Sequence, residues 1–285
     1  MPKVTGLKFS VITTNKKNNN NYTLSILIAQ DGLSFCILNK KQNSIENFHT
    51  ESFSKILNPE KILEELKKAF KFHLLEETKQ KITSVKVIYS NALYSIVPHT
   101  YFSEENLTDY LKFNIKILKT DFIAFDHIEA IEAKNVFIPY TNINNYLLDN
   151  FGEFNYKHAS TLFIEQFSEI ANQTEAYVYV EKNMLSLYIF KDKELLLANS
   201  FEYFTPQDFI YYILFCFEQL KLDTEKVRLK ILGKINETDS TYNYLYTYIK
   251  EIEFLNTSLL TTNFTNLSQK QINPKQNFLL LSNLL

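Results

Sequence analysis

Residues 22–39 read YTLSILIAQDGLSFCILN, and this stretch decides the fold. Two runs of apolar and β-branched residues flank Asp31-Gly32, a residue pair that is the strongest short signal for a β-hairpin. A third strand-like run, SIENFHT, follows at 44–50. Residues 22–50 therefore predict a three-strand antiparallel meander.

A helix and one more strand follow the meander. Asn58-Pro59-Glu60 supplies a capping side chain, a first-turn proline and a first-turn acid, which together indicate a helix start. Apolar side chains then recur on one helical face, at Ile62, Leu63, Leu66, Ala69 and Phe70. The run SVKVIYS at 84–90 predicts a strand, so the whole unit has the order β-β-β-α-β.

The same order returns in the second half of the chain. Its segments are EAYVYVEK at 175–182, MLSLYIFK at 184–191, ELLLANSFEY at 194–203, a helix start at Thr205-Pro206-Gln207-Asp208, and KVRLKIL at 226–232 before Gly233. Two copies of one unit predict a duplicated α/β fold with two mixed β-sheets, each holding a three-strand antiparallel meander and flanking helices.

Weaker patterns complete the expected layout. Before the first copy stand a strand candidate, LKFSVITT at 7–14, and the polar tract NKKNNNN at 15–21. Further helices are expected at 106–113, 142–150, 160–172, 240–250 and after Asn273-Pro274, and further strands at 121–128, 135–140, 154–158 and 252–255. We divide the chain into a first subdomain at 1–172 and a second at 173–285.

Several phrases of the sequence resemble known protein families. The stretch from NVFIPY at 135–140 through SFEYFTPQDF at 200–209 resembles the cytoplasmic actin-like proteins of type IV pilus and type II secretion assemblies. The phrases NALYSIVPHTYF, YLKFN, LLLANSFEYFTPQDFIYYIL and LKILGKI are similar to an uncharacterised Bacteroidetes family of the actin-like ATPase superfamily. The resemblance implies a duplicated ribonuclease-H-like (actin-like ATPase) fold, with 1–172 as the first actin-like subdomain and 173–285 as the second. It does not indicate any chemical reaction.

An active member of that superfamily would need an acid and a glycine in each of the two turns that hold metal and phosphates, and glycines near the adenosine. Glycine matters because only a residue without Cβ lets backbone amides approach phosphate closely. The chain has four glycines, at positions 6, 32, 152 and 233. They are too few to build three such loops in the usual way.

The two turns themselves are degenerate. The first places Asp31 and Gly32 side by side, as a tight hairpin requires, and the second reads Glu181-Lys182-Asn183-Met184 without glycine. If the cleft binds a nucleotide, Asp31, Lys182, Asn183 and Gly233 are the expected cofactor-binding residues, with ATP and magnesium as the ligands. Otherwise no cofactor, no metal and no catalytic residue is expected.

A nuclease of the ribonuclease-H type would need carboxylates at strand ends around two metal ions. The run TLSILIA at 23–29 carries none. Asp126-His127 could form a metal or acid–base pair, but the acids at 121–132 fit the solvated face and turn of a hairpin better. His49, His73, His99 and His158 lack the spacing of metal ligands.

Composition argues against a polyanionic partner. The formal net charge is −2, and Arg228 is the only arginine, so the paired guanidinium groups that usually grip phosphates and bases are missing. Cys36 and Cys216 each lie in an apolar run and read as buried thiols, which fits a reducing compartment. We expect a cytoplasmic protein that neither binds nucleic acid nor inserts into a membrane.

What remains is protein contact. The predicted helix at 209–222 is apolar nearly all round, so it should be buried on two sides, either inside its own chain or at an interface. A free edge strand of either meander could also receive a partner strand. We expect a non-catalytic actin-like scaffold or adaptor with an unidentified protein partner or self-association. The alternative is a divergent ATP-dependent switch that closes over a nucleotide.

Overall fold

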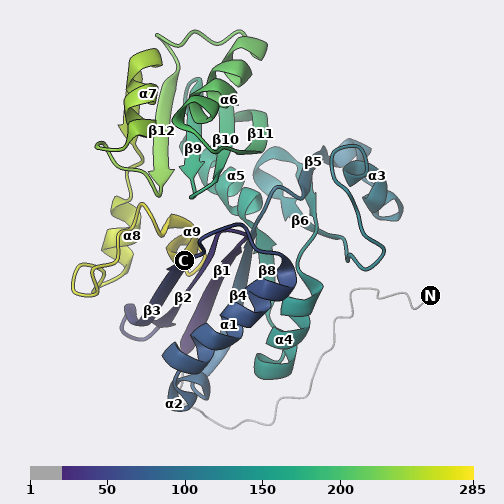
Figure 1. Cartoon of the computed structure of the whole chain (residues 1–285), viewed down its shortest axis with the longest axis vertical. Coiled ribbons are helices and arrows are strands. Elements are labelled where there is room, and N and C mark those ends of the chain that lie inside the picture. Colours follow the sequence, from purple (N-terminus) through teal and green to yellow (C-terminus); the bar gives the residue numbers. More distant parts are fainter. Residues whose placement is uncertain (1–20) are drawn as a thin grey trace.

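Two five-stranded sheets form the frame of the molecule in the computed structural model, which describes residues 21–285 (Figure 1). The strand candidate at 7–14 and nearly all of the polar tract at 15–21 lie outside the described residues.

The first sheet has the strand order β3-β2-β1-β4-β8. Its strands are β1 Tyr22–Ala29, β2 Gly32–Asn39, β3 Ser44–Ser52, β4 Ile82–Ser90 and β8 Asn155–His158. The first three form an antiparallel meander, and β4 and β8 continue the sheet in parallel. The predicted meander and the strand after the helix are therefore confirmed.

The second sheet repeats this arrangement with the order β11-β10-β9-β12-β13. Its strands are β9 Glu175–Val180, β10 Met184–Lys191, β11 Glu194–Glu202, β12 Arg228–Gly233 and β13 Glu251–Phe254. The meander is again antiparallel, and β12 and β13 are again parallel additions. Because order and direction agree in both sheets, the predicted duplication is confirmed.

Helices cover both faces of each sheet. The outer faces pack against α1 Pro59–His73 and α4 Thr141–Phe151 in the first half, and against α6 Pro206–Gln219 and α7 Ser240–Tyr248 in the second. The predicted helix starts are real: Asn58 accepts from the Lys61 N–H, and Thr205 and Asp208 form a reciprocal capping box.

A central core joins the two halves. It contains α5 Ala159–Ile170 and α9 Phe278–Ser282, with apolar side chains from the inner faces of both sheets. The last segment of the chain thus returns to the first sheet, where the Ser25 hydroxyl donates to the Leu280 carbonyl at 2.9 Å. The boundary expected between residues 172 and 173 stays a prediction.

A small third sheet projects from the first half, at the side of Figure 1 where α3 lies. Its order is β5-β7-β6, with β5 Tyr94–Pro98, β6 Ala124–Ile128, β7 Ala133–Phe137 and helix α3 Leu107–Leu111. Two further short helices are α2 Glu76–Lys79 and α8 Ser258–Asn263. Within residues 21–285, no helix combines the length and apolarity needed to cross a membrane.

Helix α6 packs only one of its two apolar faces inside the chain. Its inner face is buried through residues such as Ile213 and Phe217, but the Tyr211 side chain is 59% exposed and Phe215 is 43% exposed. The two exposed rings stack with their centroids 6.0 Å apart. Within the chain, α7 covers part of the outer surface of the helix and leaves these two rings exposed, so burial of this surface at an interface stays a prediction.

Candidate functional site

The two hairpin turns meet where the two sheets approach each other. The β1–β2 turn contributes Asp31, whose carboxylate oxygen Oδ2 accepts a hydrogen bond from the Lys182 backbone N–H of the β9–β10 turn at 2.7 Å. The Lys182 ammonium extends onto the first half and donates to the Phe53 carbonyl at 2.7 Å. Asp31 is only 5% exposed, so this contact is largely shielded from water. The two turns that would flank a bound phosphate are thus held directly against each other.

Gly32 has a local structural reason for being glycine. It is the first residue of β2, and a Cβ there would lie 2.5 Å from the Glu51 carbonyl oxygen of β3. Neither Gln30, Asp31 nor Gly32 has a positive φ. The predicted hairpin is confirmed, but Gln30 and Asp31 form its loop, and the glycine serves close approach to β3.

Gly233 is equally constrained by packing. Its φ is +99°, and a Cβ would lie 2.2 Å from the Val180 carbonyl oxygen of β9. Its N–H donates to the Lys275 carbonyl at 3.1 Å, which ties the end of β12 to the C-terminal segment. Any L-residue there would be strained and would clash with backbone.

Asn183 is held by its backbone. Its carbonyl accepts from the Tyr203 N–H at 3.0 Å, which closes the base of the β10–β11 pair. Beside it, a gap of about 10 Å³ lies between Gln30, Ile56 and Met184, too small for a ligand. The structure therefore brings Asp31, Lys182 and Asn183 together, while Gly233 lies at the end of the neighbouring strand β12, beside Val180 of β9.

Sequence reasoning missed Glu181 as a site residue. It is 3% exposed, and its Oε2 accepts from the Ser90 hydroxyl at 3.1 Å. Burial, and then the nearby Asp31 charge, raise the pKa of Glu181 to about 8. The side chain is therefore mostly protonated at pH 7. The residue types at 181–184 do not indicate that Glu181 is buried, because its burial arises only when the two halves dock.

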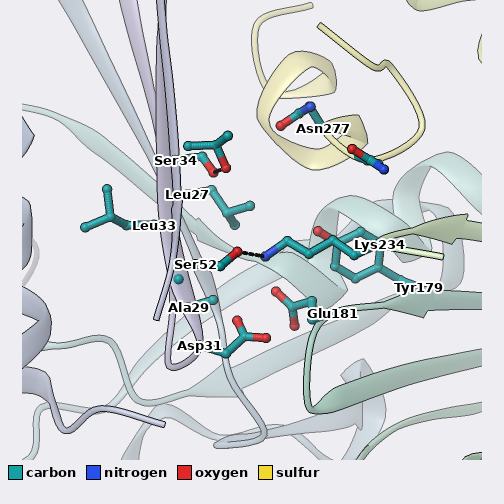
Figure 2. Close-up of a pocket in the computed structure, with 13 residues that line it drawn as sticks. Leu27, Ala29, Asp31, Leu33, Ser34, Ser52, Tyr179, Glu181, Lys234 and Asn277 are labelled. Carbon is teal, nitrogen blue, oxygen red and sulfur yellow. Dashed lines mark hydrogen bonds between the residues drawn. The ribbon is translucent and has the colours of Figure 1, made fainter. Parts of the chain in front are cut away.

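A cavity of about 200 Å³ lies beside the joined turns. Figure 2 shows Asp31 and Glu181 on one side of it and the Lys234 side chain reaching to Ser52, where the ammonium donates to the hydroxyl at 3.2 Å. The C-terminal segment closes another side with Gln276 and Asn277, which sequence reasoning also missed. Ligand pockets usually measure about 300–1,000 Å³, so this cavity is small even for a modest ligand.

The side chains of Asp126 and His127 contact different neighbours. Asp126 Oδ2 accepts from the His158 N–H at 2.8 Å and from the Thr161 hydroxyl at 2.7 Å, so the carboxylate secures the start of α5. The His127 ring contacts Lys134 instead. Burial raises the pKa of Asp126 to about 6. Among residues 21–285, no group of three or more His, Cys, Asp or Glu side chains could hold a metal ion.

Comparison with known proteins places the chain. The profile of a family described as "Protein of unknown function (DUF3822)" matches residues 12–252. The chain belongs to the DUF3822 family. No curated protein matches the DUF3822 chain in sequence.

Solved structures agree with the fold. A Bacteroides thetaiotaomicron VPI-5482 protein, described as having an actin-like ATPase fold and unknown function, matches at a TM-score of 0.70 and 23% identity over 89% of this DUF3822 chain and 96% of its own. The PilM–PilN type IV pilus biogenesis complex matches at a TM-score of 0.58 and 10% identity, over 92% of this chain and 97% of that one. The DUF3822 chain therefore has the actin-like ATPase fold that the sequence resemblance implied.

Proposed function

We propose that the protein is a non-catalytic actin-like scaffold or adaptor that works through protein contacts. The observation that carries the proposal is the Asp31–Lys182 hydrogen bond, because it joins the two turns between which phosphates would have to lie. A nucleotide would have to break this bond and remove the Lys182 ammonium from the Phe53 carbonyl. Both groups are already satisfied, so their displacement costs free energy.

The charges near the turns support the same proposal. Asp31 and Glu181 both line the cavity beside the turns, and Lys234 is the only cation among its lining residues in the described part of the chain. A triphosphate there would approach the Asp31 carboxylate within a largely water-shielded space, where like charges repel strongly, and the mostly protonated Glu181 adds no positive charge to offset this. Lys234 is itself engaged with Ser52.

The glycines support it as well. Gly32 is required by the Glu51 carbonyl and Gly233 by Val180, so packing within each sheet accounts for both residues. Neither is needed to admit a phosphate.

A protein partner is the class of ligand that remains. One structure of this fold comes from a complex of two proteins, PilM and PilN. We infer a comparable use of this chain, through an unidentified partner or self-association, without nucleic acid. Cys36 and Cys216 are buried free thiols, which suits the cytoplasmic location we propose.

Titration calorimetry with Mg-ATP tests the proposal. We expect no binding heat and no thermal shift at millimolar nucleotide, because a ligand of the folded state must stabilise it. Mg-ADP and magnesium alone serve as matched ligands. A dissociation constant below about 100 μM that weakens in Asp31→Ala would overturn the scaffold and establish the alternative, an ATP-dependent switch built on Asp31, Lys182, Asn183 and Gly233.

A further inference from the structure

Two free strand edges face each other across a groove. Strand β5 is an outer strand of the small sheet, and β11 is an outer strand of the second five-stranded sheet. A gap of about 410 Å³ separates them, between the second five-stranded sheet and the small sheet of Figure 1. It is lined by Ala92, Tyr94, Ser95, Ile96, Asn114 and the β11 residues Leu195 to Asn199.

The hydrogen-bond pattern identifies which β11 groups face the groove. In an antiparallel strand, the backbone N–H and C=O groups of successive residues point alternately toward the paired strand and away from it. The Tyr203 N–H donates to the Asn183 carbonyl, so the backbone groups of Tyr203 point toward β10. By the same alternation, the backbone groups of Ser200 and Ala198 point away from β10, into the groove. The Ser200 N–H donates to the side chain of Asn199 at 2.8 Å rather than to β10, which agrees with its outward direction. Within residues 21–285, Ala198 has no such side-chain acceptor.

The backbone groups of β5 alternate in the same way. The His99 N–H donates to Glu132, and the Leu93 carbonyl accepts from Ile138, so these two positions point at the rest of the small sheet. Tyr94, Ile96 and Pro98 therefore point outward. Proline has no N–H, and an outward position on an edge strand is where it is tolerated. The free backbone N–H groups of β5 are thus confined to Tyr94 and Ile96, across the groove from Ala198, and Pro98 adds only an outward carbonyl.

The lining of the groove fits an uncharged occupant. Proteins commonly protect exposed strand edges with lysines and other charges. Among the described residues that line this groove, none is charged. Ile96, Leu195 and Ala198 pack on the central core and form an apolar base. A charged segment would lose its hydration here without gaining an opposite charge.

We propose that this groove binds an extended, uncharged segment of a partner protein, which adds to the outer edge of β11 as a further strand. The backbone of the segment pairs with Ala198, and its alternate side chains rest on the apolar base. The outward groups of β5 form the opposite wall. This inference rests on the proposed function, since it names the kind of partner that the scaffold holds.

Capped hexapeptides of Val, Ile, Thr, Ser and Ala, each with one central Trp, provide the probe. The chain contains no tryptophan, so peptide fluorescence reports binding without background. We expect saturable micromolar binding and slower amide exchange confined to residues 195–199 and 94–96 of the full chain. Ala198→Pro removes the outward N–H and should weaken binding at least about tenfold, whereas Ala198→Ser keeps the N–H and should bind normally.

Backbone methylation of the peptide gives a test that does not depend on how the variant folds. N-methyl groups on alternate residues remove the donors from one edge of the peptide and leave its side chains in place. At least one of the two alternate methylation patterns should abolish binding. If no peptide of the pool binds, or if binding is indifferent to both Ala198→Pro and methylation, strand addition at β11 is wrong. That failure leaves the nucleotide titration untouched, so the two proposals fail separately.

Discussion

The two halves of the molecule share one strand order but differ at the turn that joins their first two strands. In the first half, β1 ends at Ala29 and the turn presents Asp31. In the second half, β9 ends at Val180 and the next residue is Glu181, which is buried, and the residue after it, Lys182, donates its backbone N–H to Asp31. The β1–β2 turn supplies a hydrogen-bond acceptor, the Asp31 carboxylate. The β9–β10 turn supplies a donor, the Lys182 N–H, and a mostly protonated acid, Glu181. The difference indicates that the turns have become complementary to each other.

The strands that follow the helices also end differently. Strand β4 ends at Ser90, whose hydroxyl reaches across to Glu181, and β12 ends at Gly233, which has no side chain. At this strand end the first half sends a side chain across the interface, while the second half ends in a glycine packed against its own strand β9. Substitutions that ignore this asymmetry should have unequal effects, and the predictions below run from the largest expected effect to the smallest.

Gly233→Ala should have the largest effect. A Cβ at 2.2 Å from the Val180 carbonyl oxygen forces β12 and β9 apart, and the φ of +99° adds backbone strain. We expect a loss of about 4 kcal/mol in the free energy of unfolding, measured by urea denaturation. Gly152→Ala is the matched control.

Gly152 also has a positive φ, of +75°, but a Cβ there would meet nothing within 4 Å. It should therefore lose only about 1–2 kcal/mol, from strain alone. Equal losses in the two variants would contradict the packing role assigned to Gly233 and reopen a ligand-binding reason for that glycine.

Glu181 should make stability depend on pH. Its pKa is about 8 in the folded protein against an ordinary 4.5, so its contribution is complete below pH 4.5 and is lost as the pH rises through 8. His158, with a pKa lowered to about 3 by burial, and Asp126, with a pKa near 6, change their contributions at lower pH. His49, whose pKa is lowered by burial and by His73, likewise completes most of its change near or below pH 6.5, so Glu181 dominates the interval from pH 6.5 to 8.

Over that interval the free energy of unfolding should fall by up to about 2 kcal/mol, because one pKa unit corresponds to about 1.4 kcal/mol. Glu181→Gln keeps the hydrogen bond with Ser90 and removes the titration, so its stability should be flat between pH 6.5 and 8. Urea denaturation at each pH measures both proteins. A wild-type profile as flat as that of the variant would show that the two halves do not bury this carboxyl group.

Asp31 offers a pair of substitutions with opposite expectations. Asp31→Ala leaves the Lys182 N–H without an acceptor in a nearly dry contact and should cost about 1–3 kcal/mol. Asp31→Asn keeps an acceptor oxygen and removes a negative charge beside Glu181, so it should stay within about 1 kcal/mol of wild type. Thermal or urea unfolding at pH 7 distinguishes the two. If Asn costs as much as Ala, the carboxylate charge matters more than the turn-to-turn hydrogen bond.

Much of the fold was predictable because it is encoded locally. The alternation of apolar residues in β1 and β2, the Asp31-Gly32 signal, and the proline-marked starts of α1 and α6 each lie within a few residues of what they specify. The duplication added a check, since an order seen twice is seldom accidental. Two strands of the small sheet, β6 and β7, were predicted, but β5 was missed, and its pairing with β7 spans an intervening helix.

The site was less predictable, because it arises from docking. Asp31 and Lys182 are separated by 151 positions, and the bond between them uses a backbone N–H that every residue except proline possesses. Nothing in the letters around Glu181 says that this acid becomes buried. The four predicted cofactor residues were chosen for what their types do in ATPases, and their role in nucleotide binding stays a prediction.

The outer helices give the smallest expected effect. The exposed side of α1 carries charged pairs such as Lys61–Glu64, whereas α6 presents Tyr211 and Phe215 at the corresponding surface. We predict that Tyr211→Glu with Phe215→Lys, an i to i+4 pair, costs no more than about 1 kcal/mol, since half-exposed rings bury little area and the new charges attract. Ile213→Ala, on the buried face, should cost about 2–4 kcal/mol by comparison.

Urea denaturation of the double variant and of Ile213→Ala, with sedimentation of each, measures both expectations. If the double variant instead loses more than about 2 kcal/mol, the aromatic face must be covered in solution, because surface substitutions away from contacts rarely change stability by more than about 0.5 kcal/mol. A second copy of the chain is the cover that sedimentation would detect, as a dimer in the wild type that the variant no longer forms. In that case the two halves would differ in purpose as well as in turn chemistry: the first would present a solvated helix, and the second an association surface.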